Sequence, residues 1–190
     1  MRISAEEYRA LPLIAHTVLE GVPLRDVSVI DLPGGGNRSI ADALSLLSGS
    51  QAGGGIASAL MRVRETVGRW LHWDDATPAT FSRFWERVPE DLRRPPGATD
   101  SGAFRLMYRR PDEALSEIRN ATVHAFLCTV LQRRPEGYRL YWAVYVLPVS
   151  WFTPVYMAVI EPFRRFLVYP SLLRRLRREW VRRYTADPRS

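Results

Sequence analysis

Short apolar segments separated by turn residues occupy the second half of the chain and predict an antiparallel sheet of three or four consecutive strands. The separators "RPDE" and "RPEG" place proline and glycine where hairpin turns favour them. An earlier segment, "LRDVSVIDLP" at 24–33, alternates apolar and polar positions and predicts a first strand. The last two segments of the series are apolar on both faces, which is typical of strands that are covered on each side or line a cavity. The series consists of residues 104–110, 112–120, 122–132 and 138–148.

Helical periodicity dominates the segments before that series. Ser39 precedes an apolar run that ends at Gly49, which predicts a helix with a serine N-cap. Residues 56–71 repeat apolar positions every three or four residues and predict a second, amphipathic helix. The prolines of 74–102 predict a long connection with one helical turn at "FSRFWERV". The N-terminal residues predict a short helix or a loose arm.

A wide apolar stripe with a spacing near 3.6 residues runs through the C-terminal segment. Pro170 interrupts it and should kink or split the helix, because its nitrogen cannot donate to the preceding turn. A stripe of this width that contains Phe and Trp predicts a helix facing the core, with the arginines on its opposite side. The stripe consists of Val155, Val159, Phe163, Phe166, Leu173, Leu176, Trp180 and Tyr184, with Tyr156, Ile160, Leu167, Leu172 and Val181 beside it.

Composition fits one globular domain whose charge is unevenly placed. The chain has 190 residues, of which 46% are hydrophobic and 25% charged, and all 27 basic residues are arginine. Residues 162–190 hold nine arginines and two acidic residues, whereas acidic and basic residues balance in 1–161. A neutral body with a basic C-terminus differs from a uniformly basic nucleic-acid binder. The aromatic residues of the terminal segment also belong to its apolar side, so nucleic acid is not an expected partner.

The uncharged stretch at 140–160 is long enough to cross a bilayer. Pro148 and Pro154 interrupt it, and its first half alternates aromatic and β-branched residues, so a strand, a turn and the start of a helix are the better interpretation. The N-terminus lacks the apolar run of a secretory signal, and we expect a cytoplasmic protein. The expected division is an N-terminal arm at 1–23, one domain at 24–184 and a tail at 185–190.

Few residues indicate a nucleotide-binding, metal-binding or catalytic site. The loop "VIDLPGGGNRS" approaches a dinucleotide-binding G-x-G-x-x-G pattern but lacks the third glycine and the β-α-β order, so we interpret it as a flexible connection. His16, His72 and His124 have no carboxylates at metal-ligand spacing, and neither a metal nor a cofactor is expected. Cys128 is the only cysteine and is interpreted as a buried thiol, because four strand residues, about 13 Å, separate it from His124.

His124 lies in an apolar strand and has two open interpretations. A buried core histidine is favoured over an acid–base or ligand-binding residue. Glu113, Glu117 and Arg119 alternate along the preceding strand, where a solvated face is expected in preference to a polar pocket wall.

The order of one strand, two helices, a run of antiparallel strands and a long final helix is similar to the helix-grip fold of the START and Bet v 1-like (SRPBCC) superfamily. In that fold a curved sheet wraps the last helix around a cavity. A finer resemblance, over most of 24–184, is to the bacterial family "domain of unknown function 2867". It implies an α+β fold with an antiparallel sheet around a long, Pro-kinked C-terminal helix and a pocket, and it implies no particular activity. The runs that carry it are "ASALMRVRETVGRWLHWD", "FRLMYRRPDEALSEIRNATVHAFL", "GYRLYWAVYVLP" and "YMAVIEPFRRFLVYPSLLRRLRREW".

We therefore expect a small-molecule-binding protein that holds a hydrophobic or amphipathic ligand between the sheet and the last helix. The candidate lining residues are Tyr108, His124, Phe126, Trp142, Tyr145, Tyr156, Met157, Ile160 and Phe163. A cyclase- or hydrolase-like enzyme that uses the same cavity, with His124 as acid or base, is an open alternative. Peripheral contact with an anionic membrane is another. It would use Arg164, Arg165, Arg174, Arg175, Arg177, Arg178, Arg182 and Arg183.

Overall fold

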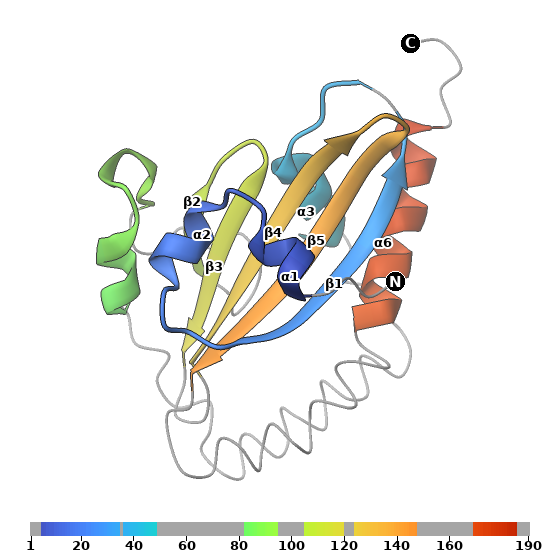
Figure 1. Cartoon of the computed structure of the whole chain (residues 1–190). Coiled ribbons are helices and arrows are strands. Elements are labelled where there is room, and N and C mark those ends of the chain that lie inside the picture. Colours follow the sequence, from blue (N-terminus) through green and yellow to red (C-terminus); the bar gives the residue numbers. More distant parts are fainter. Residues whose placement is uncertain are drawn as a thin grey trace, which may run out of the picture.

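The computed structural model describes residues 5–34, 36–48, 82–94, 105–119, 124–147 and 169–185. In this part of the chain, five antiparallel strands form one sheet with the order β1-β5-β4-β3-β2 (Figure 1). The first predicted strand is confirmed, and all four segments of the later series, from which three or four strands were expected, form strands with ends that differ by at most a few residues. They are β1 (Leu24–Pro33), β2 (Arg105–Arg109), β3 (Glu113–Arg119), β4 (His124–Arg134) and β5 (Gly137–Leu147).

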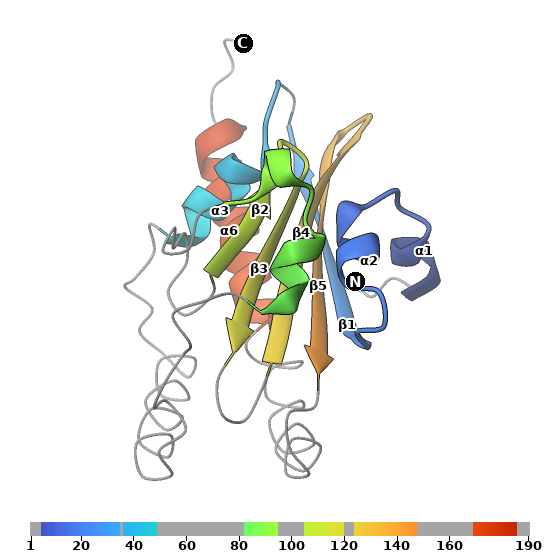
Figure 2. The same ribbon diagram turned by 90° about the vertical axis from the view of Figure 1, so that its left-hand side faces the viewer.

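Helices cover both faces of the sheet, so the fold is α+β with three layers (Figure 2). One face, here called the α1 face, packs against α1 (Ala5–Arg9), α2 (Ile14–Val18) and the short 3₁₀ helix η1 (Arg83–Arg87). A second 3₁₀ turn, η2 (Glu90–Leu92), follows η1. The other face, the α6 face, packs against α3 (Ile40–Ser48) and α6 (Tyr169–Tyr184). The two covered faces explain why β4 and β5 are apolar at nearly every position.

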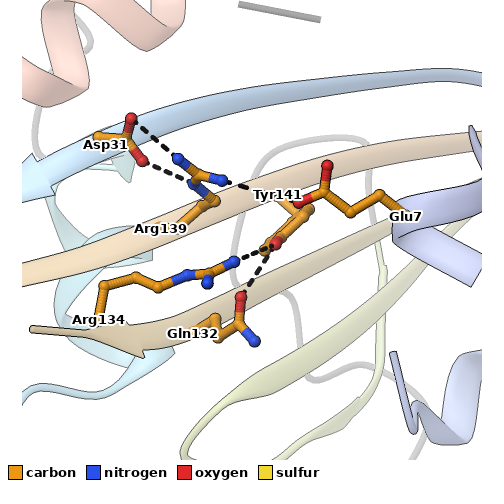
Figure 3. A network of polar contacts seen from close by, with 6 residues as sticks. All are labelled: Glu7, Asp31, Gln132, Arg134, Arg139 and Tyr141. Carbon is orange, nitrogen blue, oxygen red and sulfur yellow. Dashed lines mark hydrogen bonds and ion pairs between the residues drawn. The ribbon is translucent and has the colours of Figure 1, made fainter. Parts of the chain in front are cut away.

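The N-terminal segment is part of the core of the α1 face. Tyr8, Ala15 and Val18 are fully buried there. Arg139 on β5 also holds this end of the chain to the sheet, because it contacts Asp31 on β1 at 2.7 Å and Glu7 on α1 at 3.7 Å (Figure 3). The hydrogen bond from Arg139 lowers the pKa of the Asp31 carboxyl below its ordinary value.

Helix α6 presents its apolar side to the sheet. Pro170 lies in its first turn, where a missing N–H removes no helical hydrogen bond. The expected burial is confirmed for Leu173, Leu176 and Trp180, and the Trp180 indole donates to the Pro33 carbonyl at 2.9 Å. The expectation for Val181 is wrong: its side chain is 36% exposed, because it follows Trp180 and is rotated about 100° from the buried line.

Several expectations lie outside the described residues. These are the helix at 56–71, the part of the C-terminal stripe before residue 169 and any kink there. The predicted helical turn at "FSRFWERV" is confirmed as η1, and the first half of the uncharged stretch at 140–160 is confirmed as part of β5. Among the described helices, none combines the length and the apolar character that a membrane crossing requires.

Candidate functional site

The structure separates the residues expected to line a cavity. Four of them, Tyr108, His124, Phe126 and Tyr145, lie on the α1 face, away from α6. Trp142 lies on the α6 face, because side chains on β5 alternate between the two sides of the sheet. The remaining candidates, Tyr156, Met157, Ile160 and Phe163, lie outside the described residues.

On the α1 face, β3, β4 and η1 bring a carboxylate and an imidazole into contact. His124 Nε2 lies 2.6 Å from Glu117 Oε1, and the backbone N–H of Ser82 donates to Glu117 Oε2 at 3.3 Å. Both side chains are buried, and Phe84 and Phe126 pack against the imidazole with ring centroids 5.8 and 4.7 Å from it. This is the closest approach of acidic and basic side chains in the buried part of the described chain.

The electrostatics of this pair favour an ionised carboxylate. Burial alone would raise the pKa of Glu117, but the hydrogen bonds from His124 and Ser82 hold it below its ordinary value. An ionised carboxylate only accepts hydrogen bonds, so the contact places a proton on His124 Nε2. The pair can therefore orient the imidazole and also hold the start of η1 against the sheet.

A second buried carboxylate, Glu113, lies four residues earlier on the same face of β3. Its Oε1 accepts hydrogen bonds from the Tyr108 hydroxyl at 2.6 Å and from the Ala15 N–H at 2.9 Å. Its Oε2 accepts the Ile14 N–H at 3.2 Å. Glu113 thus satisfies donors at the start of α2, which would otherwise be buried without an acceptor.

The expectation of a solvated Glu113 and Glu117 is wrong. They are 2% and 0% exposed, because α2 and η1, which are distant in sequence, cover this side of β3. Arg119 is half-buried. The pairing of β3 with β4 contains one signal for this contact. Antiparallel pairing places Glu117 opposite Phe126, on the same face as His124. The carboxylate partner of His124 could have been found from that register.

Besides these two glutamates and His124, the α1 face carries the hydroxyls of Tyr8 and Tyr145, the His16 imidazole and the Cys128 thiol. The Tyr145 hydroxyl donates to the Tyr8 hydroxyl at 3.3 Å and lies 3.4 Å from His16 Nδ1. Burial raises the pKa of the Cys128 thiol and of the Tyr8 and Tyr145 hydroxyls above their ordinary values. Cys128 is thus buried as expected, and at neutral pH it is a protonated thiol, not an activated nucleophile.

The α6 face carries a different kind of surface at the centre of the sheet. Leu127 and Val144 are directly paired on β4 and β5, and Ala125 and Trp142 flank them on the same side. These four apolar side chains retain 6–9% exposure. On the other face of the same strands, Phe126, Cys128 and Ala143 are 0% exposed, and Val130, Tyr145 and His124 are 5–7% exposed. We call the four partly accessible residues the α6-face floor.

The predicted basic surface is present on α6. Arg164 and Arg165 lie outside the described residues. Five of the others are exposed and Arg175 is half-buried; the exposed ones are Arg174, Arg177, Arg178, Arg182 and Arg183. Within the described ranges, no group of three or more His, Cys, Asp or Glu side chains is arranged to hold a metal ion.

The glycine-rich connection after β1 packs against the end of the sheet. The Tyr138 hydroxyl donates to the Gly36 carbonyl at 2.6 Å and accepts the backbone N–H of Arg38 at 2.9 Å. The sheet beside it is antiparallel throughout its described strands, whereas a dinucleotide-binding loop belongs to a parallel β-α-β unit. The interpretation of this loop as a connection therefore agrees with the topology.

Comparison with protein families adds one finding. Residues 18–171 match the family described as "Protein of unknown function (DUF2867)", which is more than half of the 190-residue chain. The chain belongs to the DUF2867 family. The DUF2867 match contains all five strands and α3, whereas α1 and most of α6 lie outside it. No match was found among curated proteins.

Proposed function

We propose that this DUF2867 protein binds a hydrophobic or amphipathic small molecule on the α6 face of its sheet, in a helix-grip arrangement. The arrangement is supported by α6, which packs together with α3 across one face of an antiparallel sheet. Figure 2 shows both helices on that side. The ligand would lie beside α6, over the α6-face floor.

The observation that carries the proposal is the unequal burial of the two faces of β4 and β5. Both strands are central and paired on each side, so their side chains should be sealed equally if both faces were closely packed. Instead, all four residues of the α6-face floor keep 6–9% exposure, whereas at the same level of the α1 face Phe126, Cys128 and Ala143 keep 0% and Tyr145 keeps 5%. This greater residual exposure of four neighbouring apolar side chains in the middle of a sheet supports a space above them.

The chemistry of the floor defines the ligand class. Leu127, Val144 and Ala125 are aliphatic, and Trp142 adds a large aromatic surface. Such a surface recognises an apolar molecule by area and shape, at about 25 cal/mol for each Å² removed from water. A charged ligand body would lose its hydration against this floor without gaining a partner from it.

We place acid–base catalysis second. The contact between His124 and Glu117 favours it, because a carboxylate orients the imidazole of many catalytic pairs. However, His124 lies on the α1 face, so the sheet separates it from a ligand bound over the α6-face floor. Structural contacts account for both oxygens of Glu117, because Oε1 contacts His124 on β4 and Oε2 accepts the Ser82 N–H at the start of η1.

The test is binding of N-phenyl-1-naphthylamine, an uncharged fluorescent probe that the arginines of α6 do not attract. We expect Ala125→Phe to fill the space above the floor, to weaken probe binding by about tenfold or more, and to change the free energy of unfolding by less than about 1 kcal/mol. The matched control is Ala143→Phe on the closed face. It should destabilise the protein by about 1–3 kcal/mol through overpacking and leave the affinity of the folded protein unchanged.

Two results would count against the proposal. One is a wild-type protein that does not enhance probe fluorescence. The other is equal destabilisation by Ala125→Phe and Ala143→Phe, because that would mean that both faces are packed to the same density.

A further inference from the structure

The outer side of α6 forms a second surface, separate from the α6-face floor. An open depression with a volume of about 680 Å³ lies along it. The residues around the depression recur every three or four positions, so they share one side of the helix, turned away from the buried line of Leu173, Leu176 and Trp180. They are Ser171, Arg174, Arg177, Arg178, Val181 and Arg182.

The depression concentrates positive charge that α6 itself does not balance. Glu179 is the only acidic residue of this helix, and it pairs with Arg182. Arg174, Arg177 and Arg178 are exposed, and within the described part of the chain no carboxylate pairs with them. Arg174 and Arg178 are four residues apart, a spacing at which like charges destabilise a helix by about 0.2–0.5 kcal/mol.

Helix-dipole stabilisation does not account for this arrangement. Cations stabilise a helix mainly within its last turn, which here contains Arg182 and Arg183. Arg174, Arg177 and Arg178 lie in the middle of α6, where the dipole contributes little. An anion in the depression would convert their mutual repulsion into attraction.

We propose that the α6 depression binds phosphate groups, either of a soluble polyphosphate or of lipid headgroups at a membrane surface. The planar guanidinium group donates two parallel hydrogen bonds to phosphate oxygens, and several such groups around one concavity can hold a multiply charged ligand. Nucleic acid fits less well, because none of the described residues around the depression is an aromatic residue on which a base can stack. Trp180 is buried under the helix, and the ring of Tyr184 packs against Trp180.

The experiment compares two probes at about 150 mM salt, where surface charges more than about 8 Å apart are screened. Calorimetry measures binding of sodium triphosphate, and flotation measures binding to phosphatidylglycerol vesicles, with phosphatidylcholine vesicles as the uncharged reference. We expect at least one probe to bind. Triphosphate binding alone identifies a soluble ligand, and binding to the phosphatidylglycerol vesicles alone identifies a membrane surface.

Matched double variants distinguish binding in the depression from attraction by the net charge of α6. Arg174→Gln with Arg178→Gln removes two charges from the depression, and Arg175→Gln with Arg183→Gln removes two from elsewhere on α6. We expect the first pair to weaken binding by about tenfold or more and the second by less than about threefold. Thermal unfolding checks that both double variants remain folded, which we expect because the substituted side chains lie outside the core.

Three results would overturn the inference. The first is equal weakening by the two double variants, which would show general electrostatic attraction. The second is no binding of either probe at that salt concentration. The third is tighter binding of a DNA duplex than of both probes, lost in the first double variant, which would make the depression a nucleic-acid site.

Discussion

At the scale of single residues, two glutamates on one face of β3 hold covering segments that are distant in sequence. Glu113 accepts backbone N–H groups at the start of α2, and Glu117 accepts the N–H of Ser82 and contacts His124. A buried carboxylate is tolerated only where hydrogen-bond donors replace its lost water. These contacts therefore stabilise the closed α1 face.

Removal of the Glu117 carboxylate should destabilise the protein strongly. Glu117→Ala leaves the Ser82 N–H and the His124 imidazole without their acceptor, and we expect a loss of about 3–5 kcal/mol in the free energy of unfolding. Urea denaturation near neutral pH measures it. The control is Glu136→Ala in the exposed turn between β4 and β5, with an expected change within about 0.5 kcal/mol. Similar losses in both variants would refute this role for Glu117.

The contact between Glu117 and His124 predicts that the free energy of unfolding depends on pH. Because the folded-state pKa of Glu117 lies below its ordinary value of 4.5, its stabilising contribution is complete above that value. The contribution is lost as the pH falls through the folded-state pKa, since protonation then favours the unfolded chain. Wild-type protein should lose more stability than Glu117→Gln when the pH is lowered below 4.5. Parallel stability profiles of the two proteins would contradict this.

At the scale of elements, local pattern predicted the strands well and their covering segments poorly. The strands β4 and β5 were predictable from the spacing of apolar residues along the sequence, and so was the buried line of α6. The burial of Glu113 was not predictable by the same means, because it depends on α2 lying against β3. A strand pattern contains no information on which distant segment will cover it.

The close approach of β1 to β5 at Gly137 can be tested by substitution. Gly137 opens β5 with φ at +147°, and a Cβ atom there would lie 2.3 Å from the Leu32 carbonyl oxygen on β1. We expect Gly137→Ala to cost about 3 kcal/mol or more, because backbone atoms must move. Gly21→Ala is the matched control, because φ is +82° and a Cβ atom there would have no atom within 4 Å apart from those of its chain neighbours. Only the cost of the backbone conformation then applies, about 1 kcal/mol.

Thermal or chemical unfolding of the two glycine variants distinguishes clash from conformational cost. Equal destabilisation would mean that β1 does not approach β5 this closely at Gly137. A larger loss in Gly137→Ala supports the register in which Pro33 pairs with Gly137 at the end of the sheet.

At the scale of the whole molecule, the two faces of the sheet differ in character. The α1 face contains buried polar groups, whereas the α6 face combines the apolar α6-face floor with a basic outer helix surface. The α+β class was predictable from the order and period of the apolar segments. Which face holds each strand residue was not, because a period of two leaves both sides of a sheet equivalent until a covering element is known. Alternation alone separates Trp142 from Tyr145, three residues later on β5, whereas the faces of Tyr108, His124 and Phe126 relative to Trp142 depended on the strand register.

The most direct test of the ligand-binding account is nuclear magnetic resonance of the protein with bound N-phenyl-1-naphthylamine. Nuclear Overhauser contacts report which side chains lie within about 5 Å of the probe. The account predicts contacts from the probe to Ala125, Leu127, Val144 and the Trp142 ring, and none to Phe126, Ala143 or Tyr145. Contacts to that second set, or a probe that contacts neither face, would contradict it.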